Sequence, residues 1–162
     1  MTEPDKISSK ALFAQELLMR ANQSNSKSDA DSAVREWEAL ASLVSREHIS
    51  YEPILASYSV ALLLRWELGH RTDDLWRAIV MLEKALTSLP DTSTKDRYQN
   101  LANLGSAYMD RYEISRDDRR DLLRAIDAWE EAYSISRRLN LVNQAVSYIT
   151  QKDLLSAFNH HV

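Results

Sequence analysis

The chain carries nearly the same string twice, and this repetition constrains the fold more than any other feature of the sequence. RWELGHRTDDLWRAI spans residues 65–79, and RYEISRDDRRDLLRAI spans residues 111–126. Apolar residues before the central turn recur at an offset of 46, as Leu55 and Leu101 do, whereas residues after the turn recur at an offset of 47. Loops absorb single-residue insertions, and packed helical faces do not. The slip of one residue at the turn therefore indicates a repeated pair of helices.

A degenerate third copy precedes these two. Arg20 aligns with Arg65, and Val34 aligns with Ile79, at an offset near 45. Chance similarity between amphipathic helices would not preserve the shared strings of the second and third copies. The three copies therefore predict three consecutive helix pairs.

The composition agrees with a helical fold. Only two glycines and three prolines occur among the 162 residues, and β-sandwiches and barrels need such residues in their many turns. Apolar side chains recur at three- and four-residue spacing, and no segment shows the alternation of a strand. The sequence predicts an all-α protein with a disordered N-terminus at 1–8 and a single domain over 9–162.

The periodic segments place seven helices in this domain. The expected units are a first pair at about 9–45, a second at about 50–90, a third at about 93–138, and a capping helix at 141–159. The polar segment 22–31 is expected to be a linker inside the first pair.

Acidic residues at the expected helix starts predict N-caps. Asp29 or Asp31 is expected to cap the second helix, and Asp73 the fourth. The acidic turn RDDRRD at 116–121 is interpreted in the same way, as a solvated helix start and not as a catalytic carboxylate pair.

These strings resemble a known repeat family. LANLGSAY, at 101–108, has the spacing of the first helix of a tetratricopeptide repeat: a large residue, then Leu-Gly, then a tyrosine three residues later. Ala125, Trp129 and Ala132 resemble the small and aromatic positions of the second helix. The period of about 46 exceeds the usual period of about 34. This long form is similar to tetratricopeptide arrays of fungal and bacterial multidomain proteins, some of which accompany CHAT peptidase domains. The resemblance implies a solenoid of about three helix pairs plus a C-terminal capping helix.

Small residues are expected where the paired helices cross closely. Gly105 and Ser59 occupy equivalent positions in two first helices, and Ala125 and Ala78 are expected to face them. A bulky side chain at Gly105 is expected to overpack this crossing.

No residue pattern points to catalysis, a cofactor or a metal. The chain has no cysteine, and none of its four histidines has a second ligand-type residue at metal-binding spacing. Glycine-rich phosphate loops, Gly-x-Ser-x-Gly and His-Glu-x-x-His are absent from the sequence. Trp37, Trp66 and Trp129 are interpreted as core residues, and Trp76 is expected between units. We therefore expect neither enzymatic activity nor a cofactor.

The first helices of the pairs define the candidate binding site. In tetratricopeptide arrays these helices line a concave groove, and most of the side chains that the resemblance places there are apolar. The groove residues are Ala11, Gln15, Leu18, Met19, Ala56, Val60, Leu63, Leu64, Ala102, Ser106, Met109 and Asp110. Leu63 and Leu64 are either covered by neighbouring first helices or available to a partner. The lysines and asparagines with which chaperone-binding members hold a peptide carboxylate are missing here, so an amphipathic helix or apolar peptide is the expected ligand.

These observations lead us to expect a protein–protein interaction module, or scaffold, that binds a peptide or helix of another protein in its groove. Two alternatives stay open: self-association as a homodimer, and a small-ligand carrier or enzyme that uses the groove as a pocket. A net charge of −4 gives no reason to expect nucleic acid as a partner. The longest apolar run, VALLL, is far shorter than the roughly 20 residues of a membrane span, and the N-terminus lacks the apolar core of a secretory signal. We expect a cytoplasmic protein with no membrane partner.

Overall fold

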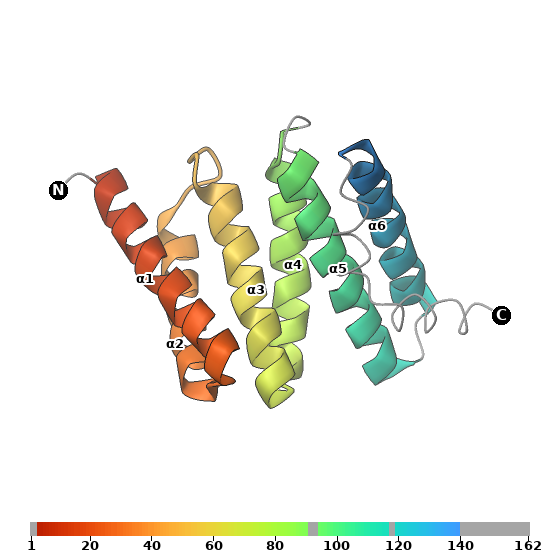
Figure 1. Cartoon of the computed structure of the whole chain (residues 1–162), viewed down its shortest axis with the longest axis horizontal. Coiled ribbons are helices and arrows are strands. Elements are labelled where there is room, and N and C mark those ends of the chain that lie inside the picture. The colour runs from red at the N-terminus through yellow and green to blue at the C-terminus, as the bar shows by residue number, and fades with distance from the viewer. Residues whose placement is uncertain (1–2, 91–93, 117–118, 140–162) are drawn as a thin grey trace. The chain divides into compact units, whose positions relative to one another are not determined.

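The computed structural model describes residues 3–90, 94–116 and 119–139. Its fold is all-α, as predicted, because these ranges contain six helices and no strand (Figure 1). The helices are α1 (Glu3–Ser24), α2 (Lys27–Leu43), α3 (Tyr51–Gly69), α4 (Thr72–Ser88), α5 (Thr94–Ser115) and α6 (Arg119–Arg138). The predicted capping helix at 141–159 lies outside the described residues.

Several helix boundaries follow the turn residues of the sequence. α3 begins directly after Ser50, which occupies its N-cap position, and ends at Gly69, as predicted. The first helix starts earlier than predicted, since α1 begins at Glu3 within the segment expected to be disordered. A run of polar residues does not exclude a helix, because one face of an amphipathic helix is polar.

The linker predicted over 22–31 is wrong. α1 continues to Ser24, and α2 begins at Lys27. Ser26, and not Asp29, is the N-cap of α2: its hydroxyl oxygen accepts a hydrogen bond from the Asp29 backbone N–H at 3.1 Å. Small polar residues are common both in loops and at helix caps. Their clustering over 22–31 therefore led to a predicted linker longer than the one observed.

The helices belong to two compact units, Met1–Ser88 with α1 to α4 and Leu89–Val162 with α5 and α6. In the first unit, α2 packs against both α1 and α3, and α3 packs against α4. Figure 1 shows α1 and α3 in one layer of this unit, and α2 and α4 in the layer behind. In the second unit, α5 packs against α6. The single domain over 9–162 stays a prediction.

Two of the tryptophans anchor the cores of their units. Trp37 is 4% exposed in the first unit, and Trp129 is 3% exposed in the second. Both are therefore core residues, as predicted. Trp66 is only half-buried, and Trp76 is exposed.

The three helix pairs share one turn geometry. Each first helix is followed by a residue with a left-handed backbone: φ is 51° at Asn25, 51° at His70 and 47° at Arg116. This conformation reverses the chain after a helix and is uncommon for residues other than glycine. Its recurrence at equivalent positions shows that the sequence repeat is also a repeat of the structure.

An arginine–aspartate pair spans each turn, and in each pair the guanidinium group donates two hydrogen bonds to one carboxylate. The pairs are Arg20 with Asp29 (2.6 and 3.1 Å), Arg65 with Asp74 (2.6 and 2.7 Å) and Arg111 with Asp121 (2.6 and 2.7 Å). The prediction that Asp29 or Asp31 is the N-cap of α2 is wrong for both, because α2 begins at Lys27 with Ser26 as its N-cap. Asp73 lies inside the first turn of α4, next to the paired Asp74. The caps expected at 117–118 lie outside the described residues.

Gly105 lies at a close crossing of α5 and α6, as predicted, and the atoms nearest to an added Cβ belong to Trp129. A Cβ atom added to Gly105 would lie 2.4 Å from Nε1 and 2.5 Å from Cδ1 of Trp129. The indole of Trp129 therefore occupies the space that any larger residue at this position would need.

Candidate functional site

The predicted groove residues of the first unit differ in exposure. Three are exposed (Gln15, Met19 and Val60), three are half-buried (Ala11, Ala56 and Leu63), and two are buried (Leu18 and Leu64). Met19 on α1 is 50% exposed and Val60 on α3 is 37% exposed, so these two supply most of the apolar surface of the set. Leu64, at 8% exposure, belongs to the core and is not available to a partner.

The predicted groove residues of the second unit are largely covered. Ala102 is 5% exposed and Met109 is 3% exposed. Ser106 and Asp110 are half-buried, so the more accessible members of this set are polar. That the residues of both units line one groove stays a prediction.

A pocket of about 160 Å³ lies between α1 and α3, with α2 contributing to its wall. Ile7 and Ala11 of α1, Trp37 of α2, and Pro53 and Ile54 of α3 supply its apolar lining, and three serines complete it. None of the lining side chains is charged. This α1–α3 pocket therefore suits an uncharged, mostly apolar group.

α1 also carries an exposed apolar residue that the sequence analysis missed. Leu12 is 73% exposed and lies one helical turn after Ser8, which lines the pocket, and Met19 continues the same row. Helical periodicity predicts that Leu12 and Phe13 share a buried stripe with Leu17, but Phe13 is 52% exposed as well, and only Leu17 is buried. Periodicity identifies an apolar face, but it does not tell whether another helix covers that face.

We use the name α1–α3 face for the exposed apolar residues Leu12, Met19 and Val60 together with the α1–α3 pocket. The sequence analysis did not place Leu12 on the surface. One signal was nevertheless present: Leu12 falls on Ser57 at the repeat offset of 45, and a serine is typical of a position that stays near solvent.

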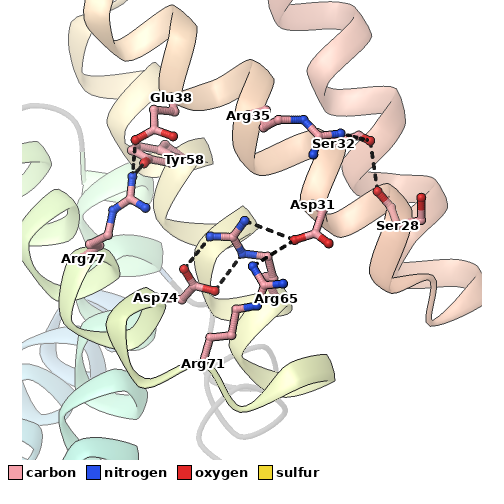
Figure 2. Close-up of polar contacts among 10 residues, drawn as sticks. All are labelled: Ser28, Asp31, Ser32, Arg35, Glu38, Tyr58, Arg65, Arg71, Asp74 and Arg77. Atoms are coloured by element: carbon pink, nitrogen blue, oxygen red, sulfur yellow. Dashed lines mark hydrogen bonds and ion pairs between the residues drawn. The ribbon is translucent and has the colours of Figure 1, made fainter.

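Arg65 connects three helices of the first unit (Figure 2). Its guanidinium group binds Asp74 of α4 through two hydrogen bonds and pairs with Asp31 of α2 at 3.2 Å. The side chains of Arg65 and Asp74 are 14% and 2% exposed. The hydrogen bonds to Asp74 raise the pKa of Arg65 above its usual value. These contacts hold α3, which carries half of the α1–α3 face, against both of its neighbours.

Arg77 and Tyr58 form a second connection between the same helices (Figure 2). Arg77 of α4 donates hydrogen bonds to the Glu38 carboxylate of α2 and to the Tyr58 hydroxyl of α3. Burial raises the pKa of Tyr58 to about 12, although the positive charge of Arg77 opposes this shift. The phenol therefore stays protonated at neutral pH, and it contributes to helix packing instead of proton transfer.

The titratable side chains in the described ranges form no metal site, because no three His, Cys, Asp or Glu residues there gather closely enough to hold an ion. His48, in the turn before α3, accepts a hydrogen bond on Nδ1 from the Ser50 backbone N–H at 3.1 Å. No helix in the described part of the chain combines the length and the apolar character needed to cross a membrane.

The α1–α3 face is thus an apolar surface with one small pocket, carried by helices that ion pairs hold together. Comparisons with protein-family models, with curated proteins and with solved structures found no match. A function for this chain is therefore inferred from its own residues.

Proposed function

We propose that this chain is a protein–protein interaction module, built as a tetratricopeptide-like stack of helix pairs, whose α1–α3 face binds an amphipathic helix or apolar peptide of another protein. One observation carries the proposal: Leu12 and Met19, in one row of α1, are 73% and 50% exposed. Large apolar side chains that gather on a surface usually mark an interaction site, because covering them removes apolar area from water.

The repeated turns support the tetratricopeptide-like part of the proposal. In a stack of helix pairs, each second helix packs against its own first helix and against the first helix of the next pair. α2 does so with α1 and α3. A residue with a left-handed backbone and an arginine–aspartate ion pair recur at the turn of each of the three helix pairs.

The size of the α1–α3 pocket favours docking of a partner side chain over enclosure of a small molecule. Its volume is about 160 Å³, whereas pockets that enclose small-molecule ligands typically measure about 300–1,000 Å³. An apolar cavity of about 150 Å³ accepts a group the size of benzene. The pocket therefore fits one leucine, methionine or phenylalanine side chain, and it supports a peptide or helix partner more than a ligand carrier or an enzyme.

The double variant Leu12→Glu/Met19→Glu tests this function. Both side chains are exposed, so the variant is expected to fold like the wild type. Each apolar side chain that a partner buries contributes about 1.5–3 kcal/mol, so the loss of both is expected to weaken binding by about 100-fold or more. The measurement is affinity capture from a cell extract with each protein as bait, followed by quantification of the captured proteins.

The matched control is Ala39→Glu/Leu43→Glu, which places the same two charges on exposed positions of one row of α2. The control is expected to capture the same proteins as the wild type. Equal capture by the α1 variant and by this control would exclude the α1–α3 face as the binding surface. Met109, at 3% exposure, is unsuitable for such a test because a charge there would disturb the fold.

Phe13 favours a second candidate function, self-association. The repeat offset of 45 places Phe13 at the position of Tyr58, and Tyr58 is 3% exposed where α3 adjoins α2. Phe13 is 52% exposed, because none of the described helices covers the corresponding face of α1. In a homodimer, a second copy of the chain would cover this face.

Sedimentation velocity at several concentrations tests self-association. A homodimer formed through α1 is expected to give larger species as the wild-type concentration rises, and Phe13→Arg is expected to stay monomeric because a charge opposes burial of this face. A wild type that sediments as a monomer at every concentration would rule out the dimer.

A further inference from the structure

A second pocket, of about 160 Å³, lies at the turn end of the first unit. Its lining consists of Lys27 and Asp31 of α2, Arg65 and Gly69 of α3, and Arg71, the residue before α4. This basic pocket shares no lining residue with the α1–α3 pocket. Figure 2 shows Arg65 and Arg71 both directed toward Asp31.

Positive charge exceeds negative charge among the residues that line the basic pocket and their ion-pair partners. Asp74 binds Arg65, and Asp31 is shared between Arg65 at 3.2 Å and Arg71 at 3.3 Å. Lys27 makes no ion pair or hydrogen bond with any side chain in the described ranges. Three cations therefore face two carboxylates, and one positive charge stays uncompensated.

The hydrogen-bond donors of the basic pocket are only partly used. Arg65 uses three of the five N–H groups of a guanidinium in its bonds to Asp74 and Asp31. The contacts of Asp31 are longer than the roughly 2.7–2.9 Å of a charge-assisted hydrogen bond, and its side chain is 31% exposed. Asp31 therefore binds Arg65 and Arg71 only weakly, and both arginines retain N–H donors for another acceptor.

Gly69 leaves the basic pocket open. A Cβ atom added there would meet only Cγ of Arg71, at 4.0 Å, and the φ angle of Gly69 is not positive. A longer side chain at this position would thus extend into the pocket without straining the backbone.

We propose that the basic pocket binds one carboxylate group, supplied either by a small free carboxylate or by an acidic side chain of a protein. Guanidinium and ammonium groups with unused donors are the groups that bind carboxylates in proteins. One negative charge balances the uncompensated positive charge, whereas a doubly charged phosphate would leave excess negative charge beside Asp31 and Asp74. Arg65 supplies a donor that Asp74 holds in place, and the exposed Lys27 and Arg71 supply donors that adjust to the ligand.

Titration of the ¹⁵N-labelled protein tests this site, with the backbone amides of Lys27, Gly69 and Arg71 as reporters. The probes are acetate for a free carboxylate, N-acetylglutamate amide for an acidic side chain, and N-acetylglutamine amide as the uncharged isostere, with chloride at equal ionic strength. Saturable shifts with either carboxylate, and none with the glutamine compound or chloride, are expected. Tighter binding of the glutamate compound assigns the site to a protein side chain, and equal binding of the two carboxylates assigns it to free carboxylates.

Four variants show whether the carboxylate occupies this pocket. Lys27→Gln and Arg71→Gln each replace a charged donor by a neutral one and are expected to weaken binding about tenfold, as the loss of a charge-assisted hydrogen bond does. Gly69→Met keeps every charge and is expected to abolish binding by filling the space. Arg35→Gln, an exposed change on α2 outside the pocket, is the control and is expected to change nothing.

Asp31→Asn gives the sharpest outcome, because it removes the internal carboxylate that competes with the ligand. Binding of acetate and of the glutamate compound is expected to become about tenfold tighter. Weaker binding by this variant, binding unaffected by Gly69→Met, or shifts that chloride reproduces would each overturn the proposal. Phosphate that binds more tightly than both carboxylates would overturn the preference for a single charge.

Discussion

Replacement of Arg65 by methionine is expected to lower the free energy of unfolding by about 3–5 kcal/mol. The variant leaves the Asp74 carboxylate, which is 2% exposed, without its cation and without two hydrogen bonds. A buried charge that loses its partner keeps its desolvation penalty and gains nothing in return. Urea unfolding followed by circular dichroism measures the change. An unchanged slope of the unfolding free energy against urea concentration would show that the cooperative transition is preserved.

Two further variants separate the ion pair from general disruption of the turn. Arg65→Met/Asp74→Leu removes both charges and is expected to recover most of the lost stability, because an apolar pair of similar volume replaces a buried ion pair at little cost. Arg20→Met breaks the equivalent pair of the first turn and is expected to have a much smaller effect, since Arg20 is 56% exposed and surface pairs contribute little. Equal losses for Arg20→Met and Arg65→Met would contradict a role for burial.

The helix pairs could be predicted because each one repeats a spacing that only helices satisfy. The offset between Leu55 and Leu101 and the one-residue slip at the turn placed α3 to α6 within a few residues of their observed bounds. The start of α2 was predicted less well. A cluster of small polar residues suits a loop or a helix cap, and the choice between them depends on whether the flanking helices continue.

The arginine–aspartate pairs were visible in the sequence but were assigned a different role. Arg65 and Asp74 recur as Arg111 and Asp121 with one residue more between them, which follows the slip in the turn. An acidic residue in the first turn of a helix interacts favourably with the helix dipole whether or not an arginine binds it. Local sequence therefore does not separate a cap from an ion pair, and the recurrence of both partners together is the signal that does.

The exposure of Leu12 and the two pockets could not be predicted from the sequence. Periodicity places Leu12 on an apolar face, but its 73% exposure reflects the lack of a described helix over that part of α1. The basic pocket combines residues of α2 and α3 with Arg71, so it depends on how three segments approach one another. Such packing distances follow from side-chain volumes across the whole unit and not from any one segment.

Gly105→Ala is expected to destabilise the protein by about 1–3 kcal/mol, the usual cost of overpacking a close contact. The added methyl group would lie 2.4 Å from Nε1 and 2.9 Å from Cε2 of Trp129. Trp129 is 3% exposed, so its indole cannot move aside without displacing its neighbours. This cost outweighs the gain of about 1 kcal/mol that alanine brings over glycine inside a helix. Thermal or urea unfolding measures the net change.

The other glycine of the chain gives a control with the opposite sign. Gly69→Ala adds the same methyl group at the end of α3, where it would meet only Cγ of Arg71 at 4.0 Å. There the substitution is expected to stabilise the protein by a few tenths of a kcal/mol up to about 1 kcal/mol, since it restricts the unfolded chain without a clash.

In the background of Trp129→Leu, which removes the indole, Gly105→Ala is expected to lose most of its cost, so the two positions should couple in a double-mutant cycle. If both alanine substitutions change stability by the same amount, or if the cycle shows no coupling, the close contact between Gly105 and Trp129 does not determine how α5 packs on α6.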